Sequence, residues 1–233
     1  MKNILLLHTS ETHVARFNKI HQENNYAQSG LKLIHLVRED FLSDFPTNKV
    51  KVKEFFSQIA SFLTTYDPHQ QKIHNILITC STIGKFSEYY PIINGAPVQR
   101  LDSFICRAAQ SAIKPLDILY TVETTYDSTK QLFLDHGIQQ SEMNMIFISK
   151  AWDAFLAGQY SLYNDLIRTQ ITQIYQNERT IILAQASMNS ALNGLPTKIK
   201  SSILSAPELA LNHYAHFDKS LTDPDLKSDS LAL

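Results

Sequence analysis

The chain has 233 residues, of which 44% are hydrophobic and 18% charged, a composition typical of a globular protein with a packed core. Lys and Arg total 21 against 22 Asp and Glu, and this balance argues against a nucleic-acid partner. The apolar run at residues 4–7 is too short for a signal peptide or a membrane span, and two cysteines form no disulfide pattern. We therefore expect a cytoplasmic protein with free thiols and no membrane partner.

Apolar runs of strand length recur along the chain, and helical-looking stretches separate them. The runs cover residues 4–7, 31–37, 76–78, 118–122, 145–148 and 181–183. This alternation is typical of α/β proteins with mainly parallel sheets. Because the runs are apolar on both faces, we expect helices on both sides of each sheet. Residues 52–66 and 151–175 have the apolar spacing of amphipathic helices, and Gly158 could divide the second one.

Cys80 ends the third apolar run, and a helix start is expected directly after it. Its neighbours Ser81 and Thr82 are small hydroxyl residues. Backbone N–H groups at the start of a helix favour anions, both a bound carboxylate and a thiolate. The alternative is a buried cysteine that packs as a small hydrophobic residue, and the local pattern leaves both interpretations open. We interpret Cys106, inside a predicted helix, as a packing residue.

Hydroxyl groups also follow three other predicted strands. In open α/β sheets, ligands bind at the carboxyl ends of the strands, so these groups are candidates for binding one small carboxylate together. Helix capping would explain each turn equally well when it is taken alone. The candidate binding residues are Thr9, Ser10, Ser81, Thr82, Thr124, Thr125 and Ser187, with Gln185 beside the last of them.

Other common site types are not indicated by the sequence. His8 and His13 stand five residues apart, and the chain contains no HxxxH or HExxH stretch, so we predict no metal site. A Gly-rich phosphate loop and a GxSxG elbow are also absent from the sequence, which argues against nucleotide-dependent chemistry and the usual serine hydrolases.

Several segments, taken in order, resemble the aspartate/glutamate/hydantoin racemase superfamily. They are residues 78–84 (ITCSTIG), 97–102 (PVQRLD) and 182–188 (ILAQASM), with His8-Thr9-Ser10 and Glu123-Thr124-Thr125 fitting the same pattern. The resemblance implies an α/β fold of two pseudo-symmetric Rossmann-like halves, with mainly parallel sheets and a cleft between them. It places residues 1–98 and 207–233 in the first half and residues 99–206 in the second. It also implies cofactor-independent chemistry on a small carboxylate ligand.

The sequence departs from this family at one position. In family racemases, a thiolate from one half removes the proton next to a carboxylate, and a thiol from the other half returns one on the opposite face. Cys80 falls on the first position, whereas Gln185 stands nearest the second, and its amide cannot transfer protons near neutral pH. We therefore expect an isomerase or lyase that uses Cys80 alone as its catalytic residue, by proton transfer, isomerisation or decarboxylation.

The sequence leaves open two alternatives to this function, and it also leaves open the oligomeric state. The first alternative is an inactive carboxylate-binding or sensor protein on the same fold. The second is racemisation with His8, His13 or Glu11 as the second base. Aromatic residues that follow the Cys80 turn, Tyr89 and Tyr90 among them, leave a homo-oligomer open.

Overall fold

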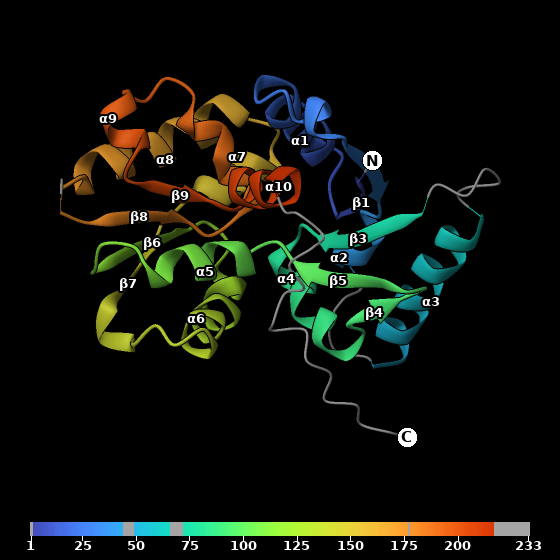
Figure 1. Ribbon diagram of the computed structural model, residues 1–233. Helices are drawn as coiled ribbons and strands as arrows, with labels where there is room; N and C mark the ends of the chain where they lie inside the picture. Colours follow the sequence, from blue (N-terminus) through green and yellow to red (C-terminus); the bar gives the residue numbers. More distant parts are fainter. Residues whose placement is uncertain (1, 44–48, 66–71, 177, 217–233) are drawn as a thin grey trace.

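Two separate sheets, one for each part of the chain, form the framework of the computed structural model (Figure 1). The structure describes residues 2–43, 49–65, 72–176 and 178–216. The first sheet has the strand order β2-β1-β3-β5-β4, and the second has the order β7-β6-β8-β9. All neighbouring strands are parallel except β4 and β5. The predicted α/β class with two mainly parallel sheets is thus confirmed.

The strands β1, β2, β3, β6, β7 and β8 overlap the predicted apolar runs, whereas β4, β5 and β9 correspond to none of them. In the first sheet they are β1 (Lys2–His8), β2 (Leu31–Val37), β3 (Ile73–Ile78), β4 (Ile92–Ile93) and β5 (Ala96–Arg100). In the second sheet they are β6 (Leu116–Tyr120), β7 (Met143–Phe147), β8 (Thr180–Leu183) and β9 (Ile203–Ser205).

Helices cover both faces of the second sheet, with α5 and α6 on one side and α7, α8 and α9 on the other (Figure 1). The longer helices are α1 (Thr12–Glu23), α3 (Lys49–Thr65), α5 (Ser103–Gln110), α6 (Tyr126–Asp135), α7 (Ala151–Leu156), α8 (Tyr160–Ile174) and α10 (Ala206–His216). Single turns form α2 (Asp40–Ser43), α4 (Ser81–Gly84) and α9 (Thr197–Lys200). The 3-10 segments are η1 (Tyr26–Ser29), η2 (Lys85–Tyr89), η3 (Glu123–Thr125), η4 (Gln140–Glu142) and η5 (Ala186–Leu192).

Gly158 separates α7 from α8 and has a φ of +72°, a conformation that glycine adopts without strain. The predicted division of this helical stretch is therefore present. No helix in the described part of the chain is long and apolar enough to cross a membrane.

One hydrophobic cluster continues from the first sheet into the second. It contains Leu6 of β1 and Leu77 of β3 together with Ile118 of β6 and Ile182 of β8. Helix α10 lies at the junction, against α1 and α5 (Figure 1), and its Tyr214 hydroxyl donates a hydrogen bond of 2.6 Å to Gln99 Oε1. Burial of this apolar surface fixes one sheet relative to the other.

The predicted division into residues 1–98 with 207–233 and residues 99–206 stays a prediction. Residue 98 lies inside β5, which belongs to the first sheet. Residues 217–233 lie outside the described part of the chain.

A buried ion pair supports the turn that carries Cys80. Arg100 Nε lies 2.7 Å from Asp102 Oδ1, Arg100 Nη2 donates to Asp102 Oδ2 at 2.8 Å, and the two side chains are 8% and 9% exposed. Burial alone would disfavour the charged guanidinium, but the Asp102 carboxylate outweighs it and raises the pKa of Arg100. A Cβ on Gly84 would approach Arg100 Cβ to 3.2 Å, so the bare glycine lets α4 pack against this pair.

Replacing Asp102 with Ala should strongly destabilise the protein. The change leaves the Arg100 guanidinium buried without its carboxylate, with only the exposed Glu88 at 3.9 Å, and we expect a loss of about 3–5 kcal/mol in the free energy of unfolding. Urea denaturation measures the loss. The control is Asp165→Ala, which removes a surface ion pair with Arg168 and should cost less than about 1 kcal/mol. Equal losses in the two variants would contradict this assignment.

Candidate functional site

A cavity of about 520 Å³ lies at the carboxyl ends of β1, β3, β6 and β8. Its volume is within the usual range for small-molecule sites, about 300–1,000 Å³. The strand ends converge here because the strands within each sheet run parallel and the shared core holds the two sheets together. Turns from both sheets therefore face the same space.

Every predicted site residue with a described side chain lines this cavity. They are Cys80, Thr9, Ser10, Ser81, Thr124, Thr125, Gln185 and Ser187. The side chain of Thr82 lies outside the described residues. The structure shows that these side chains lie around one cavity, whereas the role of each side chain stays a prediction.

The two cysteines have different environments, and both are free thiols. Cys80 is partly exposed at the cavity and precedes α4 with an extended backbone, and its carbonyl accepts a hydrogen bond of 2.8 Å from the Gly84 N–H. Cys106 is fully buried in the core on α5, and burial raises the pKa of its thiol. Of the two thiols, only Cys80 can meet a ligand in the cavity.

Hydrogen bonds within the second half fix the side chain of Gln185. Its Oε1 accepts from the Thr121 N–H at 2.9 Å and from the Thr121 hydroxyl at 2.7 Å, and its Nε2 donates to Thr125 Oγ1 at 3.1 Å. Thr125 in turn donates to the carbonyl of Val122 at 2.6 Å. The amide therefore ties the end of β8 to the end of β6.

Ser187 is held in a similar way, by a residue on α8. Its hydroxyl lies 2.8 Å from the hydroxyl of Tyr163, which is 1% exposed. Burial raises the pKa of Tyr163, although its hydrogen bonds with Ser187 and Thr121 oppose the effect. The phenol stays neutral and protonated, so it can donate to Ser187 and leave the serine hydrogen for a ligand.

A buried chain of hydrogen bonds occupies both ring nitrogens of His8. The Thr79 hydroxyl donates to the Leu7 carbonyl at 2.9 Å, so it accepts from His8 Nδ1 at 2.8 Å. His8 Nε2 is then the acceptor for His35 Nδ1 at 2.9 Å. Burial, assisted by the neighbouring His13, lowers the pKa of His8 to about 2. His8 is therefore neutral and fully engaged, and it cannot act as the second base considered above.

The other two candidate bases differ in position. Glu11 is exposed and does not line the cavity. His13 lines it, and its buried Nδ1 has no hydrogen-bond partner among the described residues. Burial, with a smaller effect of Arg16, lowers the pKa of His13 to about 3, so the ring is a neutral and weakly basic wall of the cavity. No group of three potential metal ligands gathers in the described ranges.

Sequence reasoning missed the apolar wall of the cavity. Trp152, Phe155 and Leu156 on α7 face it, and the first two rings stack at a centroid distance of 4.8 Å. In the sequence, these residues belong to the amphipathic stripe that predicts a helix packed on a sheet. A stripe does not reveal which of its members lie beyond the edge of the sheet, so no local signal could have separated them.

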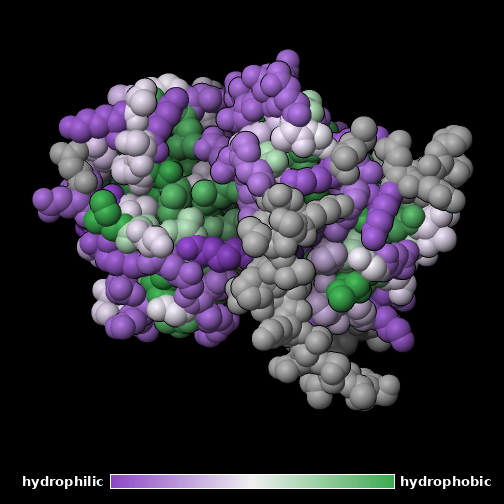
Figure 2. All heavy atoms as spheres, viewed as in Figure 1, coloured by the Kyte–Doolittle hydropathy of each residue, from purple (hydrophilic) through white to green (hydrophobic). Residues whose placement is uncertain are grey.

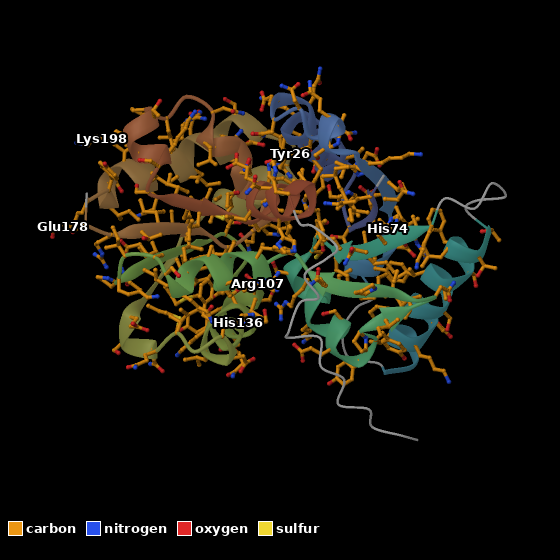
Figure 3. All side chains as sticks on the ribbon, viewed as in Figure 1. Tyr26, His74, Arg107, His136, Glu178 and Lys198 are labelled. Carbon is orange, nitrogen blue, oxygen red and sulfur yellow. The ribbon has the colours of Figure 1, made fainter. Side chains whose placement is uncertain are left out.

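A second cavity, of about 500 Å³, opens at the amino end of β8 and contains none of the predicted residues. Its lining includes Lys198, which lies at the outer end of the second half, far from the junction (Figure 3). Figure 2 shows apolar surface on this half of the molecule, and Ile113 at the cavity is 60% exposed. Arg179 in the same lining is paired with Asp117 at 2.8 Å. The cavity beside Cys80 is therefore the better candidate site.

The neutral state of His13 predicts that stability falls in acid. Its pKa is about 3 in the folded chain, against an ordinary histidine value of 6.5. As the pH falls below 6.5, the unfolded chain binds a proton that the folded chain excludes, so stability present above that pH is lost towards pH 3. Between pH 7 and pH 5 this one group should lower the free energy of unfolding by about 2 kcal/mol.

Urea denaturation of the wild type and of His13→Asn at both pH values tests this. The variant should lose about 2 kcal/mol less than the wild type over the interval, while the contribution of His8 cancels because both proteins contain it. An equal loss in the two proteins would show that His13 is not held neutral.

Comparisons with known proteins agree on the fold. No protein-family model matches the sequence, and no curated protein matches it either. Among solved structures, the aspartate racemase of Picrophilus torridus superposes with a TM-score of 0.64 at 12% identity, covering 92% of this chain and 94% of that one. The allantoin racemase of Klebsiella pneumoniae superposes with a TM-score of 0.66 at 11% sequence identity, and the match covers 92% of this chain and 86% of that one. The glutamate racemase of Aquifex pyrophilus superposes with a TM-score of 0.54 at 12% sequence identity, and the match covers 93% of this chain and 84% of that one. The chain therefore has the fold of these racemases, and the resemblance expected from the sequence is confirmed at the level of fold.

Proposed function

We propose that this protein is a racemase-type enzyme that needs no cofactor and moves a proton at the carbon next to the carboxylate of a small ligand. The observation that carries the proposal is the position of Cys80, a partly exposed thiol in the cavity where both sheets end. The likeness in fold to aspartate, glutamate and allantoin racemases supports it. Cys80 is the acid/base group.

The hydroxyl groups of the cavity form two sets: in one, the hydroxyl hydrogen already bonds to the protein, and in the other it can be donated to a ligand. Thr125 gives its only hydroxyl hydrogen to the Val122 carbonyl and accepts from Gln185, so we assign it to holding the turn. Ser187 keeps its hydrogen when Tyr163 donates to it. Donation to the ligand carboxylate therefore falls to Ser187 and to the other hydroxyls in the lining: Thr9, Ser10, Ser81 and Thr124.

A single thiol limits the reaction to one face of the ligand. In proton transfer, the Cys80 thiolate takes the hydrogen from the α-carbon, the electron pair remains on that carbon, and the same sulfur returns a proton. In decarboxylation, the bond to the carboxyl carbon breaks, carbon dioxide leaves, and the thiol protonates the remaining carbanion. Gln185 cannot supply a proton on the opposite face because its amide neither gives nor takes one near neutral pH.

A carboxylate-binding or sensor protein is the second candidate. The hydrogen bonds of Gln185 favour it, because a fixed amide preserves the shape of the second half without any acid/base group. In that case Cys80 would form part of the cavity wall and would not react.

The first test is proton NMR in deuterated buffer over amino dicarboxylates, hydroxy acids, malonates, maleate and hydantoins. We expect the wild type to exchange, isomerise or decarboxylate one class, and Cys80→Ser to lose about 100-fold or more in rate, the usual scale of a general acid/base group. Cys106→Ala is the matched control and should remain active because that thiol is buried away from the cavity. Full turnover by Cys80→Ser would exclude the enzyme as proposed, and binding without turnover by the wild type would favour the sensor.

The second test concerns stereochemistry on a substrate that keeps its α-hydrogen. With one thiol, the wild type should incorporate deuterium with retention of configuration, and Gln185→Cys should add inversion by supplying a donor on the second half. Gln185→Ala is the control, since it loses the same hydrogen bonds with Thr121 and Thr125 but supplies no thiol. Chiral chromatography separates the products. Inversion by the wild type would mean that a second base operates.

A further inference from the structure

A smaller cavity, of about 380 Å³, adjoins the Cys80 cavity. The two share Phe155 and Ser187 in their linings. The smaller one lies among α1 of the first half and α8 and η5 of the second half. Two cations, Arg16 and Lys19, line it, and no carboxylate belongs to its described lining. Lys19 is paired with Glu23 at 3.7 Å, whereas Arg16 forms no ion pair with a described acid, so the uncompensated positive charge of this cavity is that of Arg16.

Arg16 is the central group of this smaller cavity. Its Nε donates to Ser190 Oγ at 3.2 Å, a contact that links α1 to η5 across the two halves. Among the described residues, its buried Nη1 has no hydrogen-bond partner, and no ion pair joins Arg16 to an acid. Burial lowers the pKa of Arg16, and the nearby Tyr163 and Tyr160 oppose this effect. Arg16 as a whole is half-buried, and a guanidinium that is partly removed from water without a counter-ion is costly, so such groups are normally paired.

Two more buried polar atoms close to Arg16 lack partners in the described part of the chain. Asn164 Oδ1 belongs to the lining of the same cavity, and His13 Nδ1 lies in the Cys80 cavity, three residues before Arg16 on α1. Residues at this spacing lie on the same face of a helix. Native proteins leave few buried polar groups unpaired, so the two unpaired atoms on Arg16 and Asn164, which line one cavity, point to a ligand there.

We propose that the cavity around Arg16 is a binding site for a small oxyanion, of which a carboxylate is the best fit. The guanidinium fork matches the two oxygens of a carboxylate. Asn164 can turn its amide and donate from its NH2 group to the same anion. Because Arg16 comes from the first half and Asn164 and Ser190 come from the second, the bound anion holds the halves together. The anion is either the far end of a ligand that extends past Phe155 or a separate molecule.

The test compares the melting temperature of the full chain in sodium acetate and in sodium chloride of equal ionic strength. Acetate should raise the melting temperature of the wild type and have no such effect on Arg16→Met. In chloride alone, Arg16→Met should be at least as stable as the wild type, because the unpaired buried charge is gone. An Arg16→Met protein that is less stable in both salts, or that fails to fold, would overturn the proposal and make Arg16 a structural residue.

Asn164→Asp provides an independent check with almost no change of shape. The new carboxylate should pair with Arg16, so the melting temperature in chloride should rise and the response to acetate should disappear. An unchanged acetate response in this variant would also count against the site. Neither measurement depends on turnover by Cys80, so failure here and failure of the proposed enzyme are separate results.

Calorimetric titration of the wild type and of Arg16→Met with acetate and with succinate distinguishes the two sources of the anion. If one ligand spans both cavities, succinate should bind at least 10-fold more tightly than acetate to the wild type, and Arg16→Met should remove this advantage. If the anion is a separate molecule, acetate should bind at two sites in the wild type and at one in the variant. The absence of any difference between the two proteins would contradict an anion site at Arg16.

Discussion

The apolar core shared by the two sheets is the constraint on which the site depends. Leu6 and Leu77 of the first sheet and Ile118 and Ile182 of the second lie in one buried cluster. A cluster of this kind is close-packed, so its members cannot shift independently. The carboxyl ends of β1 and β3 are therefore held opposite those of β6 and β8, and a cavity forms between turns that are far apart in the sequence.

Within this frame, the two halves use corresponding turns for different purposes. After β3, the turn presents Cys80 to the cavity and rests on the Arg100–Asp102 ion pair. After β8, the turn presents Gln185, whose hydrogen bonds are all made within the second half. One turn presents a thiol to the cavity, and the other holds an amide in a fixed position. The asymmetry lies in the side chains, because the strands that carry them are arranged alike.

Much of the fold was predictable from the sequence because buried parallel strands are continuous apolar runs. Residues 4–7 and 31–37 correspond closely to β1 and β2. The strands β4, β5 and β9 escaped prediction. The two or three residues of β4 and β9 give no period to recognise, and in β5 the residues Pro97 and Gln99 interrupt the apolar pattern. The positions of Cys80 and Gln185 at strand ends were also predictable, because each residue directly follows an apolar run that marks a buried strand.

The part of the site that could not be predicted comes from helices. Arg16 lies on α1, where a sequence pattern gives the face of a residue but not which neighbouring element covers it. Ser190, which accepts a hydrogen bond from Arg16, and Asn164, which lines the same cavity, are more than 140 positions away in the chain. Only tertiary packing brings such groups together. The lack of a counter-ion for the Arg16 guanidinium can therefore be recognised from the folded structure but not from the sequence.

The position of α10 has a consequence for how the protein matures during synthesis. This helix, residues Ala206–His216, fills the junction between α1 and α5 and contributes Tyr214 to the shared core. A ribosome releases both sheets before it releases this helix, so a nascent chain can form its strands while the joint between them is still incomplete. Among the described helices, α10 is the last in the chain, so the joint that holds the two sheets together is completed after the sheets themselves.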